Sequence, residues 1–339
     1  MATDSSNDGS NALRSLVSRP VNRMETLSEA AYAYLLLIPA FILLAIVAFY
    51  PLIATFRMSL LADETAGASP FGEFVGFQNY VDVLTGQTRL TREFVDVGLS
   101  GSFPFLELGT PFLRQALFVT LAFAILSVLF ETLIGFGQAL VLDQDFRGRR
   151  WVRVAIILPW AIPVAIQGML FYLMFQPTVG FGSDLMQTIG IFGSSPLASS
   201  RDGFIIVLVA DIWKTSAFMA LLILAGLQSV DRSLYDVAKV SGASPWQRFK
   251  LITLPIVLPA LLVAMLFRTM DAMRVYGVID STVGCTTVPS LTCLVVDGLF
   301  GGTRIYATAA TVAFMTAVVI GLFVIVYLWQ FRESEGGFA

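Results

Sequence analysis

The stretch of sequence that decides the fold runs from residue 229 to residue 255 and reads SVDRSLYDVAKVSGASPWQRFKLITLP. Its first half predicts a short helix that begins near Asp231 or Ser233. This helix should end at Gly242, because glycine readily adopts the left-handed conformation of the residue that follows a helix. Four apolar residues share one face of it: Leu234, Val237, Ala238 and Val240.

The second half of the stretch predicts another short helix. Ser244 is its N-cap, Pro245 takes the first helical position, and Gln247 stands three residues after the cap, as in a capping box. Its apolar stripe consists of Trp246, Phe249 and Ile252. The apolar face of such a helix must be buried, either in the lipid interface or against another protein. An interfacial helix would be rich in lysine, and the first helix has only Lys239, so we predict docking to a partner protein.

The composition of the 339-residue chain indicates a membrane protein. Apolar residues make up 56% and charged residues 13%, and the mean hydropathy is +0.78. An average soluble domain is about 45–50% apolar and about 25% charged. The chain has no histidine and two cysteines, which excludes a histidine base, a Ser-His triad and a cysteine-rich metal site. The net charge of −3 offers no basic surface for nucleic acid.

Six stretches are apolar enough to cross a bilayer. A spanning helix needs about 20 mostly apolar residues, because its backbone polar groups must be satisfied within the segment. The predicted spans are Ala31–Ile53, Ala116–Leu142, Val154–Phe175, Phe204–Leu227, Ile252–Phe267 and Ala307–Gln330. We expect the short fifth span to continue as a helix through Arg268–Ile279, and Pro159 and Pro163 to kink the third. The predicted fold is an all-α membrane protein with six transmembrane helices.

The lysines and arginines of the loops predict the orientation in the membrane. Residues 1–30, 143–153, 228–251 and 331–339 together hold 12 basic residues among 74, whereas the loops on the other side hold 8 among 129. Both termini are therefore expected in the cytoplasm and the chain in the cell membrane. We predict a cytoplasmic segment 1–30 and a transmembrane domain 31–339, with an outward loop 54–115 and a cytoplasmic loop 228–255.

The cytoplasmic loop resembles the EAA loop of ABC importer permeases, whose pattern is EAA-x3-G-x9-I-x-LP. Asp236-Val237-Ala238, Gly242 and Ile252-Thr253-Leu254-Pro255 keep every spacing, with Asp236 in place of the glutamate. The flanking stretches 157–163, 211–214, 224–227 and 266–271 are similar to those of the maltose, trehalose and glycerol-phosphate permeases, and the likeness extends from about residue 31 to 280. It implies the type I ABC importer permease fold.

The resemblance also implies a set of partners. A second homologous permease, a dimer of a cytoplasmic ABC ATPase and an extracytoplasmic sugar-binding protein would complete the importer. This chain would be a non-catalytic permease without a cofactor, because ATP and Mg would bind the ATPase. The residues expected to couple it to that ATPase are Asp236, Ala238, Gly242, Ala243, Leu254 and Pro255.

Charged residues inside two of the spans mark a candidate substrate pathway. Such residues are costly in a membrane and usually face the bundle interior or a water-filled path. Asp211 and Lys214 are three residues apart and can pair, as can Arg268 and Asp271. By likeness to maltose-type permeases, the substrate contacts fall near Asp211, Thr215, Phe218, Asp271, Ala272 and Val275. The charged residues Lys214 and Arg268 complete the candidate pathway. The alternative is that these pairs only position helices.

Other residues carry narrower expectations. Glu131, followed by Gly135 and Gly137, predicts a buried polar contact between closely packed helices. Cys285 and Cys293 lie in an outward loop as either a disulfide or two free thiols. The outward segment 84–110 has no assigned role.

The favoured function is uptake of a glucose-, trehalose- or maltose-like sugar by the permease subunit of an ATP-driven importer. One alternative is a secondary transporter or channel that needs no ATPase, although no internal repeat supports it. Another is a glycerol-phosphate permease, which is less favoured because the candidate pathway balances acids with bases. An intramembrane enzyme would lack a histidine or a Ser/Lys pair for catalysis.

Overall fold

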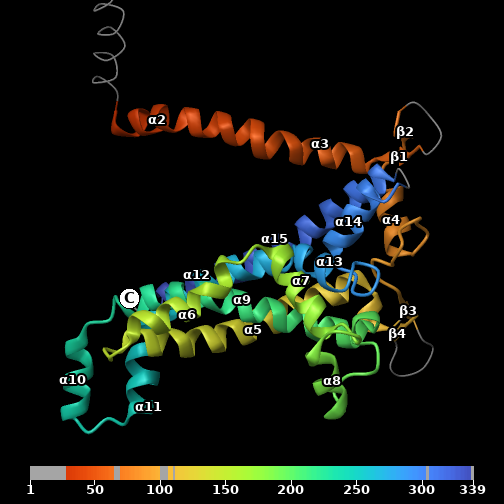
Figure 1. The fold of residues 1–339 in the computed structure, drawn as a ribbon. Coiled ribbons are helices and arrows are strands. Elements are labelled where there is room, and N and C mark those ends of the chain that lie inside the picture. Colours follow the sequence, from red (N-terminus) through yellow and green to blue (C-terminus); the bar gives the residue numbers. More distant parts are fainter. Residues whose placement is uncertain (1–27, 65–68, 100–105, 110, 303–304, 337–339) are drawn as a thin grey trace, which may run out of the picture. The chain divides into compact units, whose positions relative to one another are not determined.

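The computed structural model describes residues 28–64, 69–99, 106–109, 111–302 and 305–336. Over these residues the chain is mostly helical (Figure 1), and it divides into two compact units, residues 1–57 and 58–339. The predicted N-terminal segment 1–30 falls almost wholly outside the described residues. Five of the described helices, or six spans if one bent pair counts as a span, are long and apolar enough to cross a membrane, as the prediction of a helical membrane protein requires.

The described part of the first unit is a helix that begins after Ser28, whose hydroxyl accepts a hydrogen bond from the Ala31 N–H. It comprises α2 (Glu29–Leu44), the π-helical turn η1 (Ala45–Phe49) and α3 (Tyr50–Ser59), which ends two residues inside the second unit. Ala31–Ser59 is long and apolar enough to cross a membrane, so the first predicted span is confirmed.

Four further helices of the second unit can each cross a membrane. They are α5 (Ala116–Asp143), α9 (Ser200–Leu227), α12 (Leu254–Ala272), which is extended by the helical residues from Pro245 onward, and α15 (Tyr306–Gly336). The expected continuation of the fifth span through residue 279 is wrong. The α12 helix ends at Ala272, where Arg274 and Val275 turn back to the carbonyls of Asp271 and Ala272, and α13 (Gly277–Thr282) starts anew.

The predicted third span is a bent pair of helices. α6 (Arg149–Ala161) and α7 (Val164–Phe175) meet at 94°. Pro163 causes the break, because the residue before a proline avoids the helical conformation, and Ile162 is accordingly extended. Pro159 lies inside α6 without ending it. The expected kink is therefore a sharp bend at Pro163, and the described residues hold six spans if the pair counts as one.

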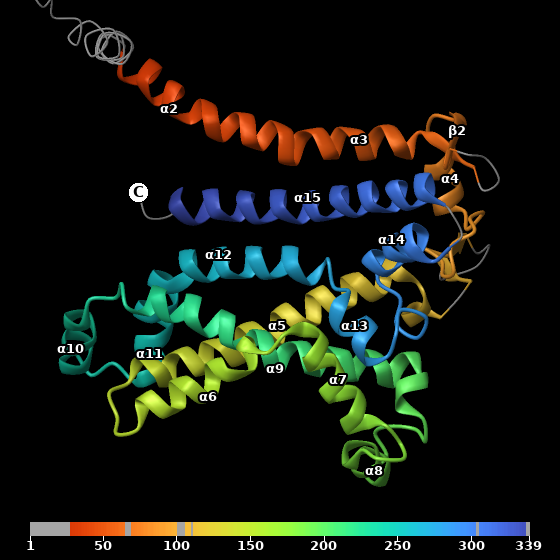
Figure 2. The ribbon, with the colours of Figure 1, turned by 45° about the horizontal axis from the view of Figure 1, so that its top comes forward.

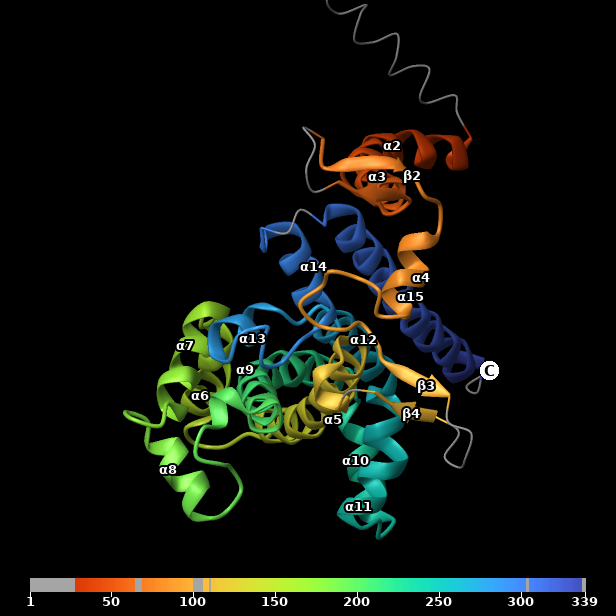
Figure 3. The same ribbon diagram turned by 90° about the vertical axis from the view of Figure 1, so that its right-hand side faces the viewer.

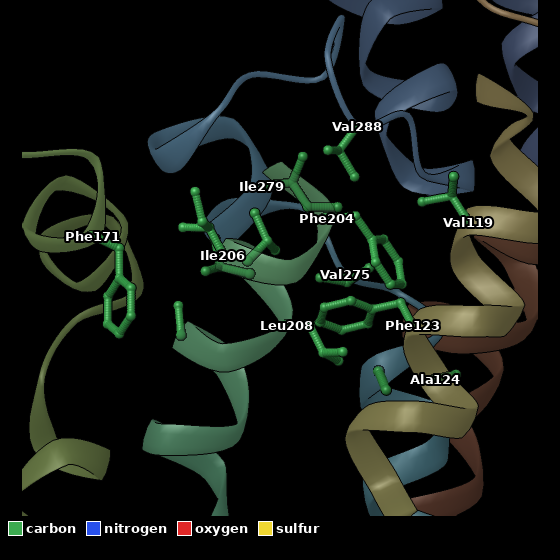
Figure 4. Packing of buried hydrophobic residues seen from close by; sticks show 14 of the residues in the cluster. Val119, Phe123, Ala124, Phe171, Phe204, Ile206, Leu208, Val275, Ile279 and Val288 are labelled. Carbon is green, nitrogen blue, oxygen red and sulfur yellow. The ribbon is translucent and has the colours of Figure 1, made fainter. Parts of the chain in front are cut away.

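The centre of the second unit is formed by α5, α9 and α12, which lie side by side (Figure 2). α5 and α9 approach closely at Gly135, where an added Cβ would lie 2.7 Å from the Cβ of Met219. Gly137 has open space around it, so the prediction of close packing holds for Gly135 alone. Phe123 of α5 meets Phe204 of α9 edge-on in an apolar cluster that α13 also joins (Figure 4).

One end of the bundle, called here the α14 end, is closed by polar links to the last helix. β1 (Leu61–Asp63) pairs with β2 (Phe71–Phe74), and α4 (Gln78–Leu84) and α14 (Leu291–Phe300) lie beside α15 (Figure 3). Both carboxylate oxygens of Asp63 accept hydrogen bonds from the start of α15: Oδ1 from the Ala307 N–H at 2.6 Å and Oδ2 from the Thr308 N–H at 3.1 Å. Asp63 thus caps the helix from a distant strand.

The segment after α4 is anchored to a disulfide loop at the same end. Cys285 and Cys293 are bonded, with 5.6 Å between their Cα atoms, which decides between the two alternatives for these residues. Arg92 donates two hydrogen bonds, at 2.7 and 3.1 Å, to the Thr286 carbonyl, and Phe94 packs in a cluster with Leu291. The described part of segment 84–110 therefore braces this loop.

The remaining elements are short. They are β3 (Val97–Leu99), β4 (Leu106–Leu108), η2 (Phe112–Arg114), α8 (Phe181–Thr188), η3 (Pro196–Ala198), α10 (Arg232–Val240), α11 (Pro245–Arg248) and the π-helical turn η4 (Phe249–Thr253). α10 and α11 project from the end of the bundle opposite to α14 (Figure 2).

Candidate functional site

The α10 helix has the predicted boundaries. Asp231 is its N-cap, and the Ser233 N–H donates to the Asp231 carboxylate at 2.9 Å, which holds the pKa of Asp231 below its usual value. Gly242 has φ +79° and its N–H donates to the Lys239 carbonyl, while the Ala243 N–H reaches the Ala238 carbonyl at 2.9 Å. These bonds form a Schellman motif, so Gly242 ends α10 in the expected way.

The α11 helix also starts as predicted. Ser244 Oγ accepts from the Gln247 N–H at 3.3 Å, and Gln247 Oε1 accepts from the Ser244 N–H at 2.7 Å. Pro245 takes the first helical position. The two caps fix a tight turn between α10 and α11.

The described residues of the chain leave Val237 and Val240 of α10 and Trp246 of α11 uncovered, whereas Phe249 and Ile252 of the predicted second stripe pack against the bundle. Val240 is 91% exposed, and Val237 and Trp246 are also largely exposed. Asp236 lies among them and pairs with Lys239 at 3.3 Å, with both side chains open to solvent. Ala238, Ala243, Leu254 and Pro255 are half-buried. An exposed apolar face with an acidic centre suits a docking surface.

The loop is tied to two of the long helices. Arg232 of α10 pairs with Asp143 at the end of α5 at 2.7 Å, and the Tyr235 hydroxyl lies 2.8 Å from Thr253 Oγ1 at the start of α12. Phe249 packs edge-on against Phe136 of α5. A cavity of about 420 Å³ lies between these contacts. Side-chain contacts therefore link the loop to both α5 and α12.

A buried ionic cluster lies in the middle of the bundle. Arg268 of α12 contacts carboxylates from three helices: Glu131 of α5, Asp211 of α9 and Asp271 of its own helix. Arg268 is 3% exposed, and Glu131 is fully buried. The Arg268 Nη2–Glu131 Oε1 distance is 2.9 Å and the Arg268 Nη1–Asp271 distance is 3.2 Å. The expected buried contact of Glu131 is confirmed, and its partner is Arg268.

Only one of the two ion pairs predicted from the sequence forms in the structure. Arg268 and Asp271 do pair, whereas among the ion pairs of the described residues the partner of Asp211 is Arg268 and not Lys214. The reason is geometric: α12 brings a guanidinium directly to Asp211, and Arg268 can serve several carboxylates at once. Lys214 is buried nearby, within electrostatic reach of Asp211 and Asp271.

A cavity of about 180 Å³ opens beside the cluster. Five of the eight predicted pathway residues line it: Asp211, Arg268, Asp271, Ala272 and Val275. Lys214, Thr215 and Phe218 are not among its lining residues. The Thr215 hydroxyl donates to the Asp211 carbonyl of its own helix, and Phe218 stacks on Trp160. The lining also includes Phe123, Val164, Arg274 and Tyr276, which sequence patterns did not single out.

Residues 131–332 match the family model "Binding-protein-dependent transport system inner membrane component". The chain belongs to this family. It is a multi-pass inner-membrane permease of an ABC importer, a non-catalytic component without a cofactor that works with a binding protein and an ATPase. A secondary transporter, a channel and an intramembrane enzyme do not fit this assignment.

Several relatives share nearly the whole length of the permease. It is 33% identical to the trehalose/maltose transport system permease protein MalF of Thermococcus litoralis, over 88% of this chain and 93% of that protein. It is 31% identical to the trehalose transport system permease protein SugA of Mycobacterium tuberculosis, over 94% of each. The sn-glycerol-3-phosphate transport system permease protein UgpA of Rhizobium meliloti is 28% identical over 89% of this chain and 94% of the relative.

A solved structure has the same fold. A chain of a bacterial ABC transporter that imports the acidic polysaccharide alginate superimposes with a TM-score of 0.65, at 21% identity, over 93% of the permease and 99% of that chain. The importer permease fold is thereby confirmed.

Proposed function

We propose that this permease takes up a sugar of the glucose, trehalose or maltose kind, delivered by an extracytoplasmic binding protein. Its MalF relative is named for trehalose and maltose transport and its SugA relative for trehalose transport. A second homologous permease and a dimer of the ATPase would complete the complex in the lipid bilayer. Both termini and the α10–α11 loop would face the cytoplasm, and the α14 end would face outward.

The observation that carries the coupling part of the proposal is the apolar surface of Val237, Val240 and Trp246 on α10 and α11, which the described residues leave exposed. Val240 is almost fully exposed beside the acidic Asp236, on a loop whose turn is fixed by Gly242. We assign this face to a cleft on the ATPase, with Asp236 as the charged contact. Ala238 and Ala243 would pack at its edge, and Leu254 and Pro255 would carry the motion into α12.

The proposed substrate pathway runs past the ionic cluster. Sugar hydroxyls donate hydrogen bonds to carboxylates, and sugar rings pack on aromatic faces. Asp271 is the most exposed carboxylate of the cluster, and Phe123 lines the same cavity. Lys214, Thr215 and Phe218 remain part of the proposal as residues that the path reaches when the bundle opens.

The test is uptake by the complete importer in proteoliposomes. The double variant Asp236→Ala/Gly242→Pro should abolish ATP-driven uptake, because it removes the acidic contact and the left-handed turn together. Membrane insertion, measured by fractionation and protease protection, should remain normal. Asp145→Asn is the matched control, since Asp145 is 96% exposed in the turn between α5 and α6. Normal uptake by the double variant would refute the coupling role.

A glycerol-phosphate permease is the second candidate, and the UgpA relative supports it. A phosphate site is expected to present free arginine or lysine side chains. The cluster instead surrounds its arginine with three carboxylates, so an uncharged sugar is favoured.

A further inference from the structure

We infer that Glu131 is a specificity-determining residue of the permease. Glu131 binds the Arg268 guanidinium, which is then not available to the substrate. The pathway therefore selects uncharged polyhydroxyl compounds over their anionic derivatives. This inference rests on the proposed substrate pathway. Glu131 would act without touching the substrate, because it does not line the cavity.

The hydrogen-bond inventory of Arg268 supports this role. A guanidinium has five N–H donors. Nε donates to Glu131, Nη2 donates to both Glu131 and Asp211, and Nη1 donates to Asp271. Four of the five donors are therefore directed at carboxylates of the chain itself. A bidentate contact to an anionic substrate would have to displace at least one of these bonds, on a side chain that is 3% exposed.

The cavity lining that a substrate would contact presents an exposed carboxylate in place of a guanidinium. Asp271 is 67% exposed, lines the cavity and carries oxygens that accept hydroxyl protons. Arg274, the other arginine of the lining, lies 3.8 Å from the same carboxylate. A phosphate or carboxylate entering here meets the Asp271 carboxylate beside Arg274, and like charges repel.

Removing the charge of Glu131 should weaken the discrimination against anionic ligands. With Glu131→Gln the side chain keeps its size, but the net charge of Arg268 and its three carboxylates rises from −2 to −1, so the site repels an anion less. We therefore expect the preference for the uncharged ligand to fall by about tenfold or more.

The experiment measures ligand binding by calorimetry to the permease–ATPase complex in lipid nanodiscs, without the binding protein, which has a ligand site of its own. The probes are trehalose with trehalose 6-phosphate, and glucose with glucose 6-phosphate. The wild-type complex should bind the uncharged member of a pair more tightly. In Glu131→Gln the dissociation constant of the phosphorylated ligand, divided by that of the uncharged ligand, should fall about tenfold. Glu131→Asp keeps the charge and should bind the two ligands with the wild-type ratio of dissociation constants. Asp145→Asn, which is not among the residues that line the cavity, should also leave this ratio unchanged.

Each outcome bears on the inference. Tighter binding of the phosphate by the wild type, or an unchanged ratio in Glu131→Gln, overturns the role of Glu131 and leaves the importer function standing. If none of the four probes binds to a complex whose ATP hydrolysis responds to the loaded binding protein, the proposed sugar pathway itself fails. If Glu131→Gln does not assemble, Asp271→Asn carries the test, because it removes the exposed carboxylate and should shift the ratio in the same direction.

Discussion

The contact between α5 and α9 at Gly135 gives a sharp test of the packing. In Gly135→Ala the new Cβ would lie 2.7 Å from the Cβ of Met219 and 3.0 Å from the backbone nitrogen of Ala220. Carbon atoms in contact prefer about 3.5–4.0 Å, so the two helices would have to separate. Overpacking of this kind costs about 1–3 kcal/mol. The helix itself would gain about 0.5–1 kcal/mol from the loss of a glycine, and the net effect should be destabilising.

The assay is thermal unfolding of the purified permease in detergent, followed by fluorescence-detected size exclusion. Each kcal/mol should lower the apparent melting temperature by about 2–4 °C. Gly137→Ala is the matched control, because it lies two residues further along α5 with nothing within 4 Å of the new Cβ. It should melt at or slightly above the wild-type temperature. Equal melting of the two variants would refute the close approach of α5 and α9.

Two further predictions concern the α14 end. Asp63→Ala should remove about 1–2 kcal/mol of capping and speed hydrogen exchange at Ala307, because its N–H loses the carboxylate; unchanged exchange would contradict the cap. The wild-type protein, denatured without reductant, should take up no maleimide, because both of its cysteines form the disulfide. Cys285→Ser should label once, at Cys293, and labelling of the unreduced wild type would show that the bond is absent.

The features predicted well from the sequence are those set by neighbouring residues. The caps at Ser244 and Gly242 depend on residues within five positions, and the structure forms both as expected. The spans follow from apolar length alone. Pro163 marked a bend, but its 94° angle depends on what α7 packs against and no local rule predicts it.

The features missed depend on residues far apart in the chain. Helical periodicity put Asp211 and Lys214 on one face, yet Asp211 pairs with Arg268, 57 residues away. Glu131 was expected to be buried, but its partner is 137 residues away. Arg92 reaches Thr286 across 194 residues, so the role of its segment was invisible in the sequence. Charge and helical periodicity indicate which face of a helix a residue occupies. Tertiary packing decides which distant residue it pairs with.

The cap that Asp63 places on α15 has a consequence for biogenesis. The carboxylate and the N–H group that it accepts from are 244 residues apart. Ribosomes add about 5–20 residues per second, so the start of α15 is synthesised about 12–50 s after Asp63. A nascent chain released before residue 306 would carry an unsatisfied Asp63 and an unanchored α4.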